Sequence, residues 1–396
     1  MRKILFISGS SNLEATYKKF GNLNVLFDYD GETVRKWFDK TILVWFPAPN
    51  DLILNLVDDF EINEIKIPLG RLSLLGFIIC VLKCVCKVHK EQVNIIRSWD
   101  PYLSGFIGYI VSKLVRVPFC ISIHADYDKR WELDGPACGA TVLGSRKVAN
   151  LLAHFVLSRT RIVMPIRESL ANYAIKHGAR PETIRIIPHG IDLNPFLSPR
   201  NSFASPTTSF KKEFGLEGKR IVVFAGRLSK DNYVYQILEI AKKVSEKRDD
   251  VIFALVGSGN EEENLKKRVK EEGLENVVVF FGFQLQHKVI EFRKNADVNL
   301  CLMGGFSLIE SCASGRPVIA YDVEWHYELI KNEKTGFLIE EGNTDRVTEK
   351  IIFLLNDEQL AQRLGTNAKK LAFEKHSLEN TSKIKISVYE ELLKIR

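Results

Sequence analysis

No segment of this 396-residue sequence is apolar for long enough to span a bilayer. The most apolar stretch, Leu72 to Val88, is interrupted by Lys83 and Lys87, and it is shorter than the roughly 20 residues that a transmembrane helix needs. The chain opens on a predicted strand, Ile4 to Ile7, and not on an apolar leader. We therefore expect a cytoplasmic protein with a buried helix at 72–88. The alternative is that this helix also touches the inner face of a membrane.

Cysteine is scarce and forms no recognisable framework. The seven cysteines are odd in number, most lie within apolar runs, and Cys80, Cys84 and Cys86 have neither a CxxC spacing nor a nearby histidine pair. Disulfide scaffolds and zinc sites have other spacings. We therefore expect reduced cysteines packed in the core.

Acidic pairs with the DxD spacing occur twice, at Asp28 and Asp30 and at Asp126 and Asp128. Paired carboxylates of this kind can hold Mg²⁺ on a diphosphate. Chance matches to so short a pattern are frequent, and both pairs lie far in sequence from the glycine-rich loop described below. The sequence therefore predicts no metal ion.

Positive charge is concentrated in the first half of the chain. Residues 1–200 contain 26 Lys and Arg against 19 Asp and Glu, whereas residues 201–396 contain 30 of each. This excess favours an anionic partner for the first half, such as a phospholipid surface or a phosphorylated acceptor. There is no basic run with interleaved aromatic residues, so nucleic acid is not expected to be a partner.

Apolar strands alternate with helical segments throughout the chain. Segments such as 72–90 and 102–114 are long enough for crossover helices, so the pattern predicts an α/β fold with parallel sheets covered on both faces. A polar, Pro- and Ser-rich linker at 198–209 separates two domains, predicted at 1–197 and 210–376. The predicted strands are 4–7, 42–46, 93–97, 119–124, 161–165, 220–225, 251–256, 277–281, 297–302 and 317–321.

The segment Met303 to Asp322 predicts an anion site. A strand at 297–302 leads into Gly304 and Gly305, then into a short helix with Ser307 as its N-cap, and a second strand follows. Such a loop aims the free N–H groups of a helix start at the carboxyl edge of a parallel sheet, where a phosphate binds. Glu310, one turn into the helix, is placed to accept hydrogen bonds from ribose hydroxyls. On spacing alone, a packing role for this segment is equally open.

Three further candidate residues lie at the end of a predicted strand or directly after it. Arg227 follows 220–225 and offers a planar fork suited to a diphosphate, although such arginines are more often surface ion-pair partners. Gly257 belongs to a GxG turn, but no third glycine follows at the dinucleotide spacing, and the acidic run 261–263 disfavours a pyrophosphate there. His124 ends a strand, where a histidine is most often structural.

The segment Glu310 to Ala320 resembles the nucleotide-sugar site of the retaining glycosyltransferases of family 4, which have the GT-B fold. Similar matches cover Phe224 to Leu228, Val256 to Gly259, Phe280 to Gln284 and Ile184 to Asp192. The resemblance implies two Rossmann-like domains facing a central cleft. The N-terminal domain would bind the acceptor and the C-terminal domain the nucleotide sugar, and a last helix at about 377–396 would cross back to the N-terminal domain.

The resemblance also implies roles for individual residues. His124 would reach the transferred sugar, Arg227 with Lys230 would stabilise the departing diphosphate, and Glu310 would hold the ribose. The remaining donor-binding residues would be Gly257, Phe283, Gly304, Gly305, Phe306, Ser307 and Leu308, with Phe283 in the loop that meets the nucleobase.

Two positions depart from the family pattern. Leu302 stands where the family has a first glutamate, eight residues before Glu310, and Asn232 stands where it usually has a lysine, five residues after Arg227. The activity implied is transfer of a sugar from a nucleotide-diphosphate donor to a glycan or lipid-linked acceptor, with retention and without a cofactor, in the synthesis of cell-surface polysaccharide, glycolipid or glycoprotein glycan. Two alternatives stay open: a nucleotide-sugar epimerase or hydrolase, and a catalytically silent binding or scaffold subunit.

Overall fold

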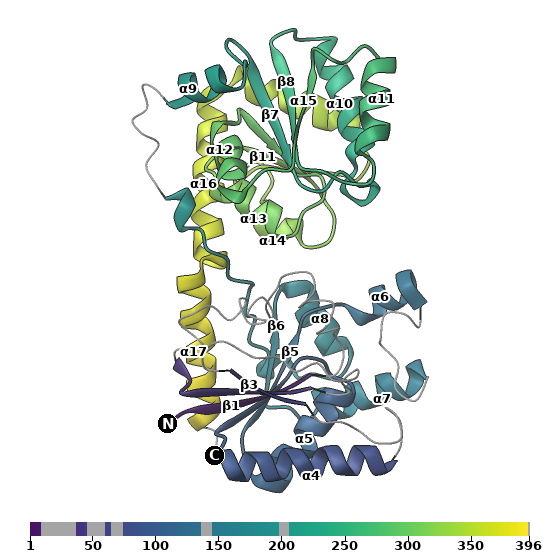
Figure 1. The fold of residues 1–396 in the computed structure, drawn as a ribbon, viewed down its shortest axis with the longest axis vertical. Coiled ribbons are helices and arrows are strands. Elements are labelled where there is room, and N and C mark those ends of the chain that lie inside the picture. The colour runs from purple at the N-terminus through teal and green to yellow at the C-terminus, as the bar shows by residue number, and fades with distance from the viewer. Residues whose placement is uncertain (9–36, 46–59, 65–73, 136–144, 198–205, 395–396) are drawn as a thin grey trace. The chain divides into compact units, whose positions relative to one another are not determined.

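The computed structural model describes residues 1–8, 37–45, 60–64, 74–135, 145–197 and 206–394 (Figure 1). The chain divides into two compact units. The first unit consists of Met1–Gly190 with Leu378–Arg396, and the second consists of Ile191–Ser377.

The first unit is built on a six-stranded sheet in the order β3-β2-β1-β4-β5-β6, and every pairing in it is parallel. In the described part of the chain, helices lie in the connections from β3 to β4, from β4 to β5 and from β5 to β6 (Figure 1). The strands are β1 (Lys3–Ser8), β2 (Lys40–Trp45), β3 (Phe60–Glu64), β4 (Ile95–Ser98), β5 (Phe119–Ile123) and β6 (Ile162–Pro165). The helices are α4 (Leu74–Glu91), α5 (Leu103–Val115), α6 (Tyr127–Asp134), α7 (Arg146–Leu157), α8 (Glu168–Lys176) and α17 (Leu378–Lys394).

Both faces of this sheet are buried, because successive side chains of a strand point to opposite faces. In β1, Leu5 and Ile7 pack in a cluster with residues of α4, α5 and α7. Ile4 and Phe6 pack in a second cluster that contains Val388 and other residues of α17. The first unit therefore takes one of its covering helices from the far end of the chain.

The second unit repeats this architecture with the strand order β12-β11-β10-β7-β8-β9, again parallel throughout. Its strands are β7 (Arg220–Ala225), β8 (Val251–Val256), β9 (Val278–Gly282), β10 (Val298–Leu300), β11 (Val318–Tyr321) and β12 (Phe337–Ile339). Its helices are α9 (Pro206–Glu213), α10 (Val234–Ser245), α11 (Glu262–Glu271), α12 (Gln286–Asn295), α13 (Phe306–Ala313), α14 (His326–Leu329), α15 (Thr344–Asn356) and α16 (Glu358–His376), with short 3-10 turns η3 (Asn194–Phe196) and η4 (Lys230–Asn232).

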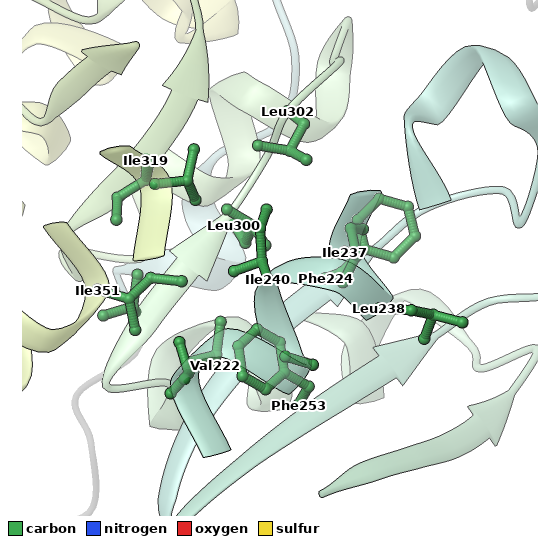
Figure 2. Packing of buried hydrophobic residues seen from close by; sticks show 14 of the residues in the cluster. Val222, Phe224, Ile237, Leu238, Ile240, Phe253, Leu300, Leu302, Ile319 and Ile351 are labelled. Carbon is green, nitrogen blue, oxygen red and sulfur yellow. The ribbon is translucent and has the colours of Figure 1, made fainter. Parts of the chain in front are cut away.

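The core of the second unit follows the same alternation. Val222 and Phe224 of β7 face Ile237 and Ile240 of α10 and Ile351 of α15 (Figure 2). The intervening residues of β7 pack on the other face with residues of α9 and α12. The amphipathic helices thus cover a sheet that is apolar on both sides, as the sequence predicted.

The order of the strands creates a topological switch point in the second unit. The chain runs outward from β7 through β8 to β9, then crosses over and runs the other way from β10 to β12, and β7 and β10 are neighbours. The loops after these two strands leave the same edge of the sheet in opposite directions. A crevice forms at such a point, and open α/β sheets bind their ligands there.

The predicted α/β class and its parallel sheets are confirmed. One strand of the first unit, β3, was not predicted. Its sequence, Phe-Glu-Ile-Asn-Glu, alternates apolar and polar residues and lies at the edge of the sheet, so it lacks the continuous apolar run of a central parallel strand.

Two local predictions were wrong. The N-cap of α13 is Gly305, so Ser307 lies within the first turn of that helix. The predicted linker 198–209 is too long, because α9 begins at Pro206.

Among the cysteines, five are buried and unpaired. Cys86 differs from the expectation, because it is exposed on α4. Cys138 lies outside the described residues.

Candidate active site

A cavity of about 360 Å³ lies at the carboxyl edge of the second sheet, at the switch point. It is lined by the loops that follow β7, β8 and β9 and by one face each of α12 and α13. Of the residues singled out in the sequence, Arg227, Gly257, Phe283, Ser307 and Glu310 line this cavity. Residues separated by more than 80 positions in sequence are thus brought to one place by the parallel topology.

Gly257 allows two of these loops to approach each other. Its φ of +139° lies in a region that other residues rarely adopt, and a Cβ at this position would lie 1.9 Å from the carbonyl oxygen of Gly226. Only glycine fits such a position without moving the backbone. The loop that carries Arg227 is therefore packed directly on the turn after β8.

The side chain of Arg227 is exposed to a ligand. Its side chain is 70% exposed, and its ion pair with Asp231 is long, at 3.7 Å. Asn232 stands where the family usually has a lysine. Its Nδ2 donates to the carbonyl of Arg227 at 2.8 Å and to Ser229 Oγ at 3.2 Å. Asn232 thus shapes the loop without carrying charge. Lys230 is exposed in η4 and is not among the described residues that line the cavity.

The loop before α13 is braced by a histidine that the sequence reasoning did not assign. His326 is fully buried, with Nδ1 2.8 Å from the carbonyl oxygen of Tyr321 and Nε2 3.2 Å from N and 3.0 Å from O of Gly304. Burial lowers the pKa of this imidazole and so favours the neutral ring, whose Nδ1–H donates to Tyr321 and whose Nε2 accepts the Gly304 N–H. His326 therefore fixes the position of the glycine pair.

Two backbone N–H groups near the start of α13 already have acceptors within the protein. The Gly304 N–H is used by His326, and the N–H of Leu308 donates to the carbonyl of Gly305 at 3.2 Å. The side chain of Leu308 is fully buried, whereas Phe306 is 39% exposed. A ligand in the cavity would meet this helix start at Ser307.

A buried arginine was also missed. Arg293 of α12 lines the cavity but is only 2% exposed, and its Nε lies 3.4 Å from Oε2 of Glu310. In the sequence it stands beside Lys294 in the last turn of a helix, where basic residues usually serve the helix dipole. Nothing in that local pattern indicates burial.

Leu302, at the position of the family's first glutamate, belongs to the core. It is fully buried and lies beside Leu300 and Ile319 (Figure 2). An ionised glutamate could not occupy that apolar environment without a partner. The apolar surroundings of position 302 therefore suit leucine and not glutamate.

In the first unit, His124 follows β5 and is half buried. Its ring centroid lies 6.5 Å from that of Trp99, which follows β4, and 6.0 Å from that of His189. The carboxyl edge of the first sheet therefore presents an aromatic and imidazole cluster made from three separate segments.

The carboxylates of the second DxD pair have protein partners. Asp126 caps α6 by accepting the N–H groups of Asp128 and Lys129. Asp128 contacts Arg146, Lys176 and His177. Burial raises its pKa, but the hydrogen bonds from Lys176 and His177 outweigh burial and hold the pKa at about 2. The pair at 28 and 30 lies outside the described residues. No group of three or more possible metal ligands occurs in the part of the chain that the structure describes.

The two doubly wound parallel sheets, with a ligand-sized cavity at the switch point of the second, define a protein of the GT-B class. Residues 206–371 match the model for glycosyl transferases group 1, and residues 42–195 match the model for glycosyltransferase family 4. Together the two matches span most of the chain, which therefore belongs to this glycosyltransferase family and is a transferase.

Individual relatives agree with this assignment. The chain is 29% identical over 316 residues to the N-acetyl-alpha-D-glucosaminyl L-malate synthase of Bacillus anthracis, a match that covers 77% of each chain. It is 26% identical to the capsular polysaccharide biosynthesis glycosyltransferase CapM of Staphylococcus aureus, covering 84% of this chain and 86% of CapM. Its fold is similar to that of Anabaena Alr3699/HepE, solved in complex with UDP, with a TM-score of 0.72, 18% identity and coverage of 98% and 100%.

Proposed function

We propose that this glycosyltransferase takes its sugar from a nucleoside-diphosphate donor bound in the cavity of the second unit. The observation that carries the proposal is the gathering of Arg227, Ser307 and Glu310 around that cavity, at the switch point of a doubly wound sheet. A cation, a helix start and a carboxylate at one edge suit a diphosphate joined to a ribose.

Each part of the donor has a complementary group. Arg227 and the Gly305 to Ser307 backbone would bind the diphosphate, and Glu310 would accept hydrogen bonds from the ribose. Phe283 is 75% exposed beside the same cavity, and its ring offers a face on which a nucleobase can stack. We propose uridine as the base, because the similar Anabaena structures contain UDP and UDP-glucose.

The proposed reaction breaks the bond between the anomeric carbon and the diphosphate oxygen and forms a bond from that carbon to an acceptor oxygen, whose proton passes to the departing diphosphate. Negative charge develops on the departing diphosphate, where Arg227 and the helix start provide positive potential, so the proposed chemistry needs no metal ion. His124 would face the sugar. We further propose retention, as the family resemblance implies. A β-linked product from an α-linked donor, detected by NMR, would refute it.

The acceptor is proposed to be a glycan or a lipid-linked glycan in the synthesis of cell-surface polysaccharide or a related glycoconjugate. The names of two relatives support this class: CapM acts in capsular polysaccharide biosynthesis, and another relative is a poly(ribitol-phosphate) alpha-N-acetylglucosaminyltransferase of Staphylococcus aureus.

Thermal unfolding tests the donor site directly. The protein is melted with UDP, GDP, ADP, TDP and CMP sugars, alongside Glu310→Ala. A donor present at 100 times its dissociation constant stabilises the folded state by about 2.7 kcal/mol. We expect a UDP sugar to raise the melting temperature of the wild type but not of the variant. If no donor shifts the wild-type transition, the proposed donor site is wrong.

A second proposal concerns the membrane. Among the described helices none is long and apolar enough to cross a bilayer, but α4 was expected to be buried and instead presents Ile78 and Leu82, which are 44% and 56% exposed, on one face. Lys83 and Lys90 are exposed on the same helix. Apolar side chains flanked by lysines suit the interface of an anionic bilayer. We propose that α4 rests on such a surface, which would bring the enzyme to a lipid-linked acceptor.

Vesicle sedimentation tests this surface. Leu82→Asp is expected to weaken binding to phosphatidylglycerol vesicles by about tenfold or more, because the burial of one leucine is lost and the new carboxylate is repelled by the anionic lipid. Ile175→Asp, on α8 and 38% exposed in the wild type, is the matched control and should bind normally. Equal binding of the two variants would exclude α4 as the contact.

A further inference from the structure

Arg293 connects three separate parts of the proposed donor site. Its Nη2 donates to the carbonyl of Ala225 at 3.0 Å, at the end of β7 and two residues before Arg227. Its Nη1 donates to Ser311 Oγ, and its Nε lies 3.4 Å from Oε2 of Glu310, both on α13. One side chain from α12 thus ties the end of the strand that leads to the diphosphate loop to the helix that carries the ribose-binding carboxylate.

The burial of Arg293 makes this connection energetically significant. A guanidinium that is 2% exposed has lost almost all of its hydration, and that cost must be offset by an opposite charge and by polar partners. Among the described residues, Glu310 is the one carboxylate within ion-pair distance of it. Nη1 and Nη2 each donate to one polar partner, the hydroxyl of Ser311 and the carbonyl of Ala225, whereas Nε makes the ion-pair contact with Glu310 without a hydrogen bond. Arg293 is therefore held rigidly and acts as a fixed point in the site.

Glu310 is held from one side and open on the other. Its side chain is 19% exposed, and both it and Arg293 line the cavity. A glutamate on a helix surface samples several rotamers, and fixing it normally costs conformational entropy. The buried guanidinium removes that freedom before the ligand arrives, and preorganised groups bind more tightly and more selectively.

We propose that Arg293 is the positioning residue that orients Glu310 for the two ribose hydroxyls, and that it thereby sets the selectivity of the enzyme for ribonucleotide over deoxyribonucleotide donors. The inference rests on the proposed function, which places the ribose on Glu310. Arg293 contacts Glu310 and the framework, and the ribose contact itself is made by Glu310.

The test compares the affinities of UDP and 2′-deoxy-UDP by calorimetry. The wild type is expected to prefer UDP by about ten- to a hundredfold, because a hydrogen bond to a charged group contributes about that much to the affinity. Glu310→Gln should lose most of this preference, and Arg293→Met should lose it to a similar degree although Glu310 is intact. Arg293→Lys keeps the charge but cannot reach three partners at once, so its preference for UDP should lie between those of the wild type and Arg293→Met. If the methionine variant does not fold, the lysine variant provides the test.

The outcomes separate the two proposals. If Glu310→Gln discriminates as well as the wild type, or if neither nucleotide binds the wild type, the proposed ribose role fails. If Glu310→Gln loses selectivity while both Arg293 variants keep it, the proposed function stands and the positioning role is refuted. If the Arg293 variants are folded and weaken both nucleotides equally, Arg293 supports the structure of the unit without orienting Glu310, which also overturns the inference.

Discussion

Replacing Arg227 by alanine is expected to lower kcat/KM by about a hundred- to a thousandfold, which corresponds to about 2.7–4 kcal/mol of transition-state stabilisation. The departing diphosphate gains charge as the glycosidic bond breaks, and Arg227 is the cation that lines the cavity with an exposed side chain. Steady-state kinetics with the donor identified by thermal unfolding measures the effect. Arg227→Lys should recover only part of the loss, because an ammonium cannot bind two phosphate oxygens in the planar manner of a guanidinium.

Folding is not expected to change in this variant. Arg227 is 70% exposed and has one long ion pair, and such pairs contribute little to stability. Lys270→Ala, which removes an exposed cation from α11, is the matched control and should keep full activity. An Arg227→Ala enzyme with more than a third of the wild-type kcat/KM would show that the diphosphate is stabilised by other groups.

Gly257→Ala is expected to produce the largest loss of stability, about 2–4 kcal/mol. The substituted residue would be strained at a φ of +139°, and its methyl group would overlap the backbone of Gly226. In a unit of this size the loss corresponds to a fall in melting temperature of roughly 5–15 °C. Donor binding should weaken as well, because the loop that carries Arg227 must move away from the turn after β8.

Gly273→Ala provides the control for this prediction. Gly273 also has a positive φ, of +67°, but a Cβ there meets nothing within 4 Å. The control therefore measures the cost of backbone strain alone, about 1 kcal/mol. If the two variants melt at the same temperature, the close approach of the two loops does not contribute to stability.

The strands could be predicted from sequence because a central strand of a parallel sheet is apolar on both faces, as in β1, β7 and β8. The edge strand β3 was missed for the same reason, since its Glu61 and Glu64 interrupt the apolar run. Helix starts were less predictable. Gly305 takes the capping position of α13 although Ser307 has the stronger capping propensity, because the loop that His326 holds determines where the helix begins.

The candidate site was predictable where a residue follows a strand directly, as Arg227 does, since the parallel topology then fixes its edge. Arg293 and His326 could not be found in this way. Both are buried, and burial of a charged or titratable side chain depends on partners from distant segments, here Glu310 and Gly304. Lys230 is close to Arg227 in sequence but is not among the described residues that line the cavity, and its role at the diphosphate stays a prediction.

The helix α17 has a consequence for how the chain is made. It covers Ile4 and Phe6, and its Tyr389 accepts a hydrogen bond of 2.6 Å from the buried Arg97 of β4. During synthesis, the first unit therefore leaves the ribosome long before its last helix exists, with one face of its sheet uncovered. The second unit is continuous and can fold first. Nascent chains thus carry an exposed apolar sheet until α17 has been synthesised, and this sheet is the surface that a chaperone would protect.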